Sequence, residues 1–278
     1  MGQWFARLLL EEGHEVLLVG RRAEKLHRVQ ASLPVEVTTE MDRVAGSDVI
    51  IISVPPQAFE GVATEVGRHT RRGQVVTDLT SLKLAPVEAM HRHVREATVL
   101  GMHPVFGPGA PGLSNQNFVL TPTTPSEHQV AEKAQRYLEE RGAHVSLMSP
   151  AEHDEVMTVV LGLAHFIAIT AADVLLHEKH FQAMKAVGGT TFKVLYTLVE
   201  SVISEDPELY AWLQMSFPAL PGKEGHFVAT AAAWAELVKR GDHRAFVERM
   251  AELQKILEQT DPQFRQAYRD MYRITGEL

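Results

Sequence analysis

Residues 48–54 read DVIIISV, a nearly continuous run of β-branched residues. Such a run is typical of a strand in a parallel sheet, because helices cover both faces of that sheet and leave no polar side. We predict a central parallel strand here, buried on both faces.

Working outward, short β-rich runs alternate with helical patterns over the first 148 residues. A helix is expected at 23–32, and this alternation predicts an α/β domain, a Rossmann-like doubly wound parallel sheet over residues 1–149. The further strands are expected at 15–19, 35–38, 74–79, 98–101, 117–121 and 143–148.

After Ser149 and Pro150 the pattern changes to helical periodicity, with proline and glycine between the helices. We therefore predict an all-α C-terminal domain over residues 150–278. Its first helix, 151–176, is very apolar for a surface helix, which indicates a buried helix at the core of a small bundle. A helix that also packs in a homodimer is the alternative.

Composition limits the classes of function. The net charge of −8 argues against a general nucleic-acid or membrane binder, and the absence of cysteine excludes disulfides and thiolate chemistry. His165 and Asp173 interrupt the longest apolar stretch, no secretory signal is visible, and no tight metal-ligand spacing such as H-E-x-x-H occurs. We expect a cytoplasmic enzyme that acts on a small-molecule substrate without a metal.

The chain opens on a possible dinucleotide site. Such a fold normally begins with a strand and the motif G-x-G-x-x-G, after which a helix starts beside the pyrophosphate. Gly2 would be the third glycine of that motif, so we expect the first strand and the first two glycines to be absent. This form should then bind cofactor poorly, and titration beside a chain extended upstream by about 12 residues would test it.

The expected second strand ends at Gly20, Arg21 and Arg22. An NAD site usually places an acid at this point, whereas two guanidinium groups suit the 2′-phosphate of NADP. NADP is therefore favoured as cofactor, with NAD possible. Ser53, Val54, Pro55 and Pro56 follow the DVIII run, where a loop at the carboxyl end of the sheet would meet the cofactor.

Two loops carry the candidate catalytic residues. Residues 78–83 (DLTSLK) and 101–109 (GMHPVFGPG) each follow an expected strand, so both should lie at the same edge of the sheet. His103 can accept a proton from a substrate hydroxyl while hydride leaves the adjacent carbon, and Ser81 can orient the histidine or the hydroxyl. His153 and Asp154 could simply cap a helix, and His165 lies in an apolar helix where a core role is common. At about 100° per residue the two helical histidines need not share a face.

In this order and spacing the motifs resemble the prephenate/arogenate dehydrogenase family, and its archaeal-type members most. The matching pieces are GQWFA (2–6), SVPP (53–56), TSLK (80–83), HP with FG (103–107), EHD (152–154), GLAHF (162–166) and DPELYA (206–211).

The resemblance implies a nucleotide-binding domain, a helical dimerisation domain, and NAD(P)-dependent oxidative decarboxylation of prephenate or arogenate in tyrosine biosynthesis. It implies that His103 deprotonates the ring hydroxyl, that Ser81 orients His103 and the nicotinamide, and that His165 helps to bind substrate.

One position departs from the family pattern. Where the family commonly has a carboxylate-binding arginine, this chain has Ser201, and Lys193 or Lys83 is the replacement cation that we consider. Another β-hydroxyacid-type dehydrogenase and a non-catalytic nucleotide-binding protein remain alternatives, and Lys179 and Lys185 lie too far along the second domain to match the catalytic lysine of the former class.

Overall fold

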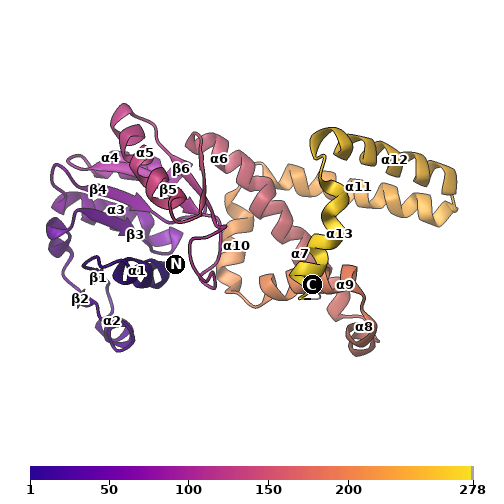
Figure 1. The fold of residues 1–278 in the computed structure, drawn as a ribbon, viewed down its shortest axis with the longest axis horizontal. Helices are drawn as coiled ribbons and strands as arrows, with labels where there is room; N and C mark the ends of the chain where they lie inside the picture. The colour runs from indigo at the N-terminus through magenta and orange to yellow at the C-terminus, as the bar shows by residue number, and fades with distance from the viewer. Residues whose placement is uncertain (277–278) are drawn as a thin grey trace. The chain divides into compact units, whose positions relative to one another are not determined.

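The computed structural model describes residues 1–276 and divides into two compact units, Met1–Met157 and a second unit that begins at Thr158 (Figure 1). Each unit is described by itself below.

The first unit is built on a mostly parallel sheet in the order β3-β4-β5-β6-β7. Only the β5–β6 pair is antiparallel among these strands, so β6 and β7 run opposite to the other three. This is the predicted Rossmann-like class with two reversed strands at one side. The strands are β3 (Val49–Ile52), β4 (Val75–Asp78), β5 (Thr98–Pro104), β6 (Asn117–Thr121) and β7 (His144–Leu147).

Helices cover both faces of this sheet, as the apolar strands require. Ile50 and Ile52 of β3 pack into a core with α3 (Pro56–His69) and α4 (Leu84–His93). The intervening Ile51 packs on the other side, in a core that includes residues of α1 (Gly2–Glu11) and α5 (Pro125–Glu139). The alternation follows from the two-residue period of a strand and gives the doubly wound, three-layer arrangement.

β3 lies at the edge of the sheet in the part of the chain that the structure describes, so the prediction of a central strand is wrong in that respect. Its two faces are covered, but β4 is its only described neighbour, and Val49 is 54% exposed. A run of β-branched residues indicates that both faces of a strand are buried, but it does not indicate how many neighbouring strands pair with it. β1 (Leu17–Val19) and β2 (Glu36–Thr38) form a separate parallel pair, connected by α2 (Ala23–Gln30) and followed by η1 (Met41–Gly46).

β5 runs three residues beyond the expected strand at 98–101 and ends at Pro104. Its extra length pairs with β6, where His103 lies opposite Val119 and Pro104 opposite Phe118. The expectation that residues 102–104 belong to a loop is therefore wrong. His103 is held by a ladder of strand hydrogen bonds, which gives it a more rigid platform than a loop would.

Helices alone make up the described part of the second unit, as predicted for the C-terminal half. Its core contains Ala168, Val199, Leu213, Phe217 and Leu220, each at most 4% exposed. The elements are η2 (Thr158–Leu163, π-helical), α7 (Ala164–Leu176), α8 (Phe181–Val187), α9 (Thr190–Ile203), α10 (Pro207–Ser216), α11 (Leu220–Arg240), α12 (His243–Thr260), η3 (Phe264–Gln266) and α13 (Ala267–Ile274).

The apolar helical stretch Pro150–Leu176 includes α6 (Pro150–Met157), η2 and α7, and it is not buried within the single chain. Only 17% of its apolar window is buried, and Val159, Val160 and Val174 are 44%, 48% and 65% exposed. The prediction of a buried core helix is thus wrong for the chain alone. By length and composition the stretch could cross a membrane, and the core helix of a soluble protein passes the same test.

Candidate active site

A buried ion pair lies directly beneath the loop that follows β4. Lys83 is fully buried, and its Nζ contacts the Asp78 carboxylate, the Met102 carbonyl at 2.9 Å and the Thr80 hydroxyl at 3.1 Å. Asp78 is also 0% exposed and accepts the Thr80 backbone N–H at 3.0 Å. The pair therefore joins the end of β4 to the start of α4 and to the neighbouring strand β5.

Ser81 lies half-exposed in the turn above this ion pair. The turn is closed locally, since the Thr80 hydroxyl lies 2.7 Å from the Leu82 carbonyl. β4 and β5 are parallel, with Asp78 opposite Gly101, so the Ser81 turn after β4 and His103 near the end of β5 lie at the same edge of the sheet. This is the edge at which the sequence predicted the two segments to meet.

Gly101 allows α4 to approach the sheet closely enough for Lys83 to reach β5. A Cβ at this position would lie 2.2 Å from the Thr121 Oγ1 and 2.6 Å from a methyl carbon of Val87. Real Cβ atoms do not approach other atoms so closely, so any larger residue would push α4 or β6 outward. The glycine is thus a packing requirement of the site.

His103 is part of a hydrogen-bonded chain of three side chains. Its Nδ1 lies 2.8 Å from the Nε2 of His153, whose Nδ1 lies 2.7 Å from the Oδ1 of Asp154. Asp154 also accepts the backbone N–H groups of Lys83 at 2.7 Å and Leu84 at 3.0 Å. Asp154 therefore caps the separate helix α4, whereas the sequence had suggested a cap of the helix that His153 and Asp154 open.

Burial sets the protonation of this cluster. Burial lowers the pKa of His103 well below 6.5, and the positive charge of Lys83 lowers it further. Burial also lowers the pKa of Lys83, while the carboxylates of Asp78 and Asp154 oppose that shift. The His103 imidazole is therefore neutral near pH 7, which is the form that can accept a proton.

Two segments expected to bind cofactor meet at the start of α1. A Cβ on Gly2 would lie 3.0 Å from the Ser53 Oγ, so the first residue of this helix contacts the segment after β3. Pro55 precedes α3, and Pro56 is its first residue, while Val54 packs partly against the core beneath. The amide-bearing N-termini of two helices, the usual setting of a pyrophosphate, thus flank the predicted cofactor residues.

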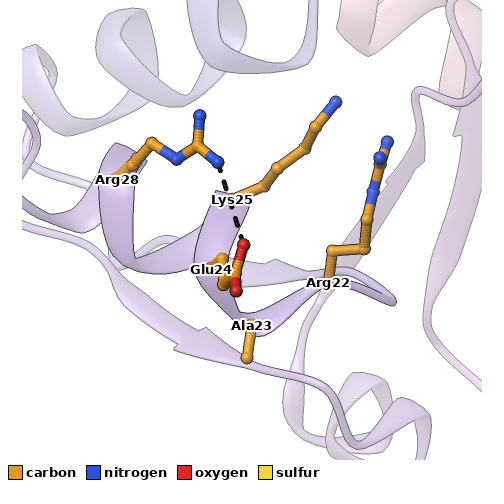
Figure 2. Close-up of a pocket in the computed structure, with 5 residues that line it drawn as sticks. All are labelled: Arg22, Ala23, Glu24, Lys25 and Arg28. Carbon is orange, nitrogen blue, oxygen red and sulfur yellow. Dashed lines mark ion pairs between the residues drawn. The ribbon is translucent and has the colours of Figure 1, made fainter.

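A shallow pocket of about 360 Å³ lies at the start of α2, and Arg22 lines it together with Lys25 and Arg28 (Figure 2). The side chains of these three residues extend to the same side of the helix start. Glu24 pairs with Arg28 at 4.0 Å. Gly20 directly follows β1 and packs against Leu26, and Arg21 is exposed without lining the pocket. This set of residues places the positive charges of Arg22, Lys25 and Arg28 at the start of α2, beside the single acid Glu24.

In the second unit, His165 lies on the first turn of α7, just after the π-helical segment η2. Its Nδ1 is buried without a hydrogen-bond partner in the described structure, and burial lowers its pKa. The ring packs edge-on against Tyr210 of α10 at 4.8 Å between centroids. A buried polar atom without a partner is costly, and a bound polar ligand would satisfy it.

The π-helical segment has its own partner. The Gln214 side chain donates to the Gly162 carbonyl at 3.0 Å, and a Cβ on Gly162 would lie 2.9 Å from a methyl carbon of Leu220. Short π-helical segments inside α-helices are frequent at functional sites, and this one directly precedes His165.

Lys193 lies in a second pocket of about 330 Å³, lined also by Lys185, Phe192 and Tyr196. Lys185 sits over the Tyr196 ring at 4.8 Å and pairs with Glu200 at 3.6 Å. Ser201, where an arginine was expected, bonds the Leu198 carbonyl of its own helix at 2.8 Å. The candidate cation and the substituted position are thus both on α9.

Sequence reasoning did not identify several of these contacts. Lys25 and Arg28 look like ordinary surface charges until the helix turns them toward Arg22. The contact of His153 with His103 joins positions 50 residues apart, which no local pattern reveals. Burial of Lys83 could have been suspected from its place in the TSLK motif beside a buried strand.

Comparison with known proteins matches both halves of the chain. Residues 5–147 match the family described as prephenate dehydrogenase, nucleotide-binding domain, and residues 149–252 match prephenate dehydrogenase, dimerization domain. A probable arogenate/prephenate dehydrogenase of Methanocaldococcus jannaschii is 33% identical over 92% of this chain and 58% of its own length. The T-protein of Enterobacter agglomerans is 26% identical over 73% of this chain and 54% of its own length. The chain therefore spans a little over half the length of these relatives.

Solved structures show the same fold. Prephenate dehydrogenase from Aquifex aeolicus, in complex with hydroxyphenyl propionate and NAD+, has a TM-score of 0.75 at 23% identity and covers 94% of this chain and 95% of its own. Arogenate dehydrogenase from Synechocystis has a TM-score of 0.70 at 18% identity and covers 93% and 96%. Because family models match nearly all of the first unit and most of the second, this chain belongs to the prephenate dehydrogenase family.

Proposed function

We propose that the protein catalyses the NAD(P)-dependent oxidative decarboxylation of prephenate or arogenate, the step that leads to 4-hydroxyphenylpyruvate or tyrosine. The observation that carries the proposal is the buried neutral His103 at the carboxyl end of β5, in a chain that belongs to this family. A small-molecule substrate and a cytoplasmic location are parts of the same proposal.

His103 acts as the general base in this proposal. Its Nδ1 faces His153, so its Nε2 is the nitrogen that serves the substrate hydroxyl. As the hydroxyl proton moves to His103, hydride leaves the same ring carbon for the nicotinamide, which supplies the hydride acceptor. The bond to the ring carboxylate then breaks, carbon dioxide departs and its electron pair makes the ring aromatic. His103 returns the proton to the oxygen, because the product retains a phenolic hydroxyl.

The other candidate residues bind and orient. Ser81, half-exposed at the same sheet edge, orients His103 and the nicotinamide. The unpartnered Nδ1 of His165 suits a hydrogen bond with the substrate, and Lys193 supplies a cation for a substrate carboxylate. Lys83 is an unsuitable carboxylate binder, because it is fully buried and its Nζ contacts Asp78.

The decisive experiment measures reduced nicotinamide with prephenate and arogenate, each supplied with NAD or NADP. Turnover with at least one pair is expected. His103→Asn should lower kcat by at least about 100-fold and leave cofactor affinity nearly unchanged, as expected for the loss of a general base. Absence of turnover with every pair, in this chain and in an upstream-extended form alike, would refute the proposal.

We further propose that NADP is the preferred cofactor. Arg22 and Lys25 line the pocket at the start of α2, while Arg28 is partly neutralised by Glu24. Arg22→Ala with Lys25→Ala should raise the KM for NADP by about 10-fold or more, since a charge-assisted hydrogen bond contributes about 1.5–3 kcal/mol and tenfold corresponds to about 1.4 kcal/mol. The KM for NAD should stay within about threefold. Arg68→Ala, at an exposed position on α3, serves as the matched control.

A homodimer through the helical unit completes the proposal. Residues 149–252 match a dimerization domain, and the helices of the second unit expose many large apolar side chains. On α12 alone, Val247, Met250, Leu253 and Ile256 are each 47–55% exposed. Contiguous apolar surface of this kind marks a protein interface.

A further inference from the structure

His103, His153 and Asp154 form a buried hydrogen-bonded network that determines which nitrogen of His103 carries a hydrogen. His103 is 4% exposed and His153 is 0% exposed, so water does not compete for the nitrogens that face each other. The two contacts, 2.8 Å and 2.7 Å, are both within hydrogen-bond range. Each of these two contacts needs one hydrogen, carried by one of its two atoms. Which atom carries it follows from the groups at the Asp154 end of the network.

The Asp154 end determines the direction of the chain. An ionised carboxylate only accepts hydrogen bonds, and this one faces three donors, the N–H groups of Lys83 and Leu84 and the Nδ1 of His153. The Nδ1 of His153 must therefore carry a hydrogen. In a neutral imidazole the other nitrogen is then an acceptor, so the Nε2 of His153 receives a hydrogen bond from His103.

From this geometry we infer that His153 and Asp154 are positioning residues that hold His103 as the tautomer with hydrogen on Nδ1, so that its Nε2 presents a lone pair to the substrate hydroxyl. The inference rests on the proposed function, in which His103 is the base. The opposite tautomer would place a hydrogen on Nε2, toward the substrate, and could not accept the proton.

The same chain stabilises the charge that forms on reaction. When Nε2 of His103 takes up the substrate proton, the ring becomes a cation whose Nδ1–H still donates to His153. The charged groups near this cation are Lys83, which opposes it, and Asp154, which favours it through His153; Asp78 neutralises Lys83. His153 therefore passes the influence of a carboxylate to a base that the carboxylate does not touch.

Asp154 is well suited to this work because its orientation is fixed from outside the pair. Its two backbone contacts lie at the start of α4, so the carboxylate stabilises a helix N-terminus as well as the His153 tautomer. A group fixed by three donors loses little freedom when the histidines align on it.

Nitrogen-15 NMR of the holoenzyme, with specifically labelled histidine, tests the tautomer directly. Long-range proton–nitrogen correlations should show hydrogen on Nδ1 of His103 in its neutral form, and loss of that signal set in His103→Asn assigns it. A neutral His103 with hydrogen on Nε2 would overturn the inference. This readout does not depend on turnover, so a His103→Asn variant that kept its activity would overturn the base assignment alone.

Two variants of His153 separate positioning from packing. His153→Gln can still accept from His103 and donate to Asp154, so its kcat should stay within about 10-fold of wild type, whereas His153→Phe can do neither and should lose at least about 100-fold in kcat. The KM for cofactor should change little in either, and His144→Gln, at an exposed position on β7, is the matched control. A His153→Phe enzyme within about threefold of wild-type kcat would overturn the inference. If either variant failed to fold, the wild-type NMR result would still decide.

Discussion

Replacing Lys83 by methionine tests the claim that a buried ion pair supports the active-site edge. Methionine has a similar length and fills the same space, so the change removes the charge with little loss of volume. In the structure the Asp78 carboxylate, fully buried, would lose its cation, and the Met102 carbonyl would lose a donor at 2.9 Å. Asp78 would retain the Thr80 N–H at 3.0 Å and a long contact of 3.4 Å from Met102.

The magnitude follows from which groups remain unpaired. Removing one partner of a buried pair leaves an uncompensated charge and costs about 3–5 kcal/mol. We expect Lys83→Met to lower the free energy of unfolding of the first unit by that amount. Asp78→Asn combined with Lys83→Met should recover part of the loss, because the buried charge is then gone.

Urea unfolding followed by tryptophan fluorescence can report the first unit alone. The sequence has three tryptophans, and in a Trp212→Phe, Trp234→Phe background the remaining Trp4 lies in the first unit, where its Nε1 donates to the Ala110 carbonyl at 2.8 Å. Arg92 lies on α4, the helix that begins beside Lys83, and forms an exposed ion pair with Glu60 of α3. Arg92→Met breaks this pair and should leave the unfolding midpoint nearly unchanged. A loss below about 1 kcal/mol for Lys83→Met would refute the reasoning.

Three further predictions concern packing, pH and assembly. Gly101→Ala should destabilise the first unit by about 1–3 kcal/mol or more through overpacking. Gly61→Ala, at a position with open space on α3, should stabilise it by about 0.5–1 kcal/mol. Urea unfolding of both variants measures these changes, and equal effects on the free energy of unfolding would contradict the prediction. Because the pKa of His103 is lowered in the folded state, the unfolded chain takes up its proton first, so stability is fully present above pH 6.5 and is lost below it by up to about 1.4 kcal/mol per pH unit. His103→Gln should flatten the pH dependence of the unfolding midpoint over that window, and an unchanged slope would count against a buried neutral histidine. Val160→Asp, at a position 48% exposed on η2, should shift sedimentation from dimer toward monomer, and a dimer of undiminished affinity would exclude this face from the interface.

Periodicity in the sequence was sufficient to predict most of the fold. The strand expected at 117–121 has those bounds in the structure, and the strand expected at 74–79 differs from β4 by one residue at each end. These segments are short apolar runs between turns, where face burial and strand length agree. The alternation of strands and helices and the change to helices after Pro150 were equally legible.

What could not be predicted was which edges and surfaces find partners. The length of β5 (98–104) could not be predicted without knowing its partner β6. Pairing with Val119 and Phe118 extends the strand past Gly101. The apolar helix over 151–176 appeared suited to a core, yet only 17% of its apolar window is buried in the single chain. Hydropathy indicates that burial of a surface would be favourable, but it does not show whether residues of the same chain bury that surface.

The candidate site shows the same division. His103 and Ser81 were accessible to sequence reasoning because each was expected just after a strand, and strand ends of a parallel sheet gather at one edge. The roles of His153 and Lys83 depend on contacts over 50 and 19 residues, to His103 and the Met102 carbonyl. Side-chain pairings over such separations become visible only once the fold places the elements together.

Lys83 links the two networks that this site contains. Its side chain joins Asp78, and its backbone N–H donates to Asp154, which in turn orients His153 and so His103. The start of α4 is therefore held by one buried carboxylate from the sheet and by a second carboxylate from α6. Burial and the Lys83 cation lower the pKa of His103, so any shift of this helix start would disturb that cation and, at the same time, the carboxylate that directs the tautomer of His103. Both the basicity and the orientation of the proposed base thus depend on one residue whose side chain is fully buried.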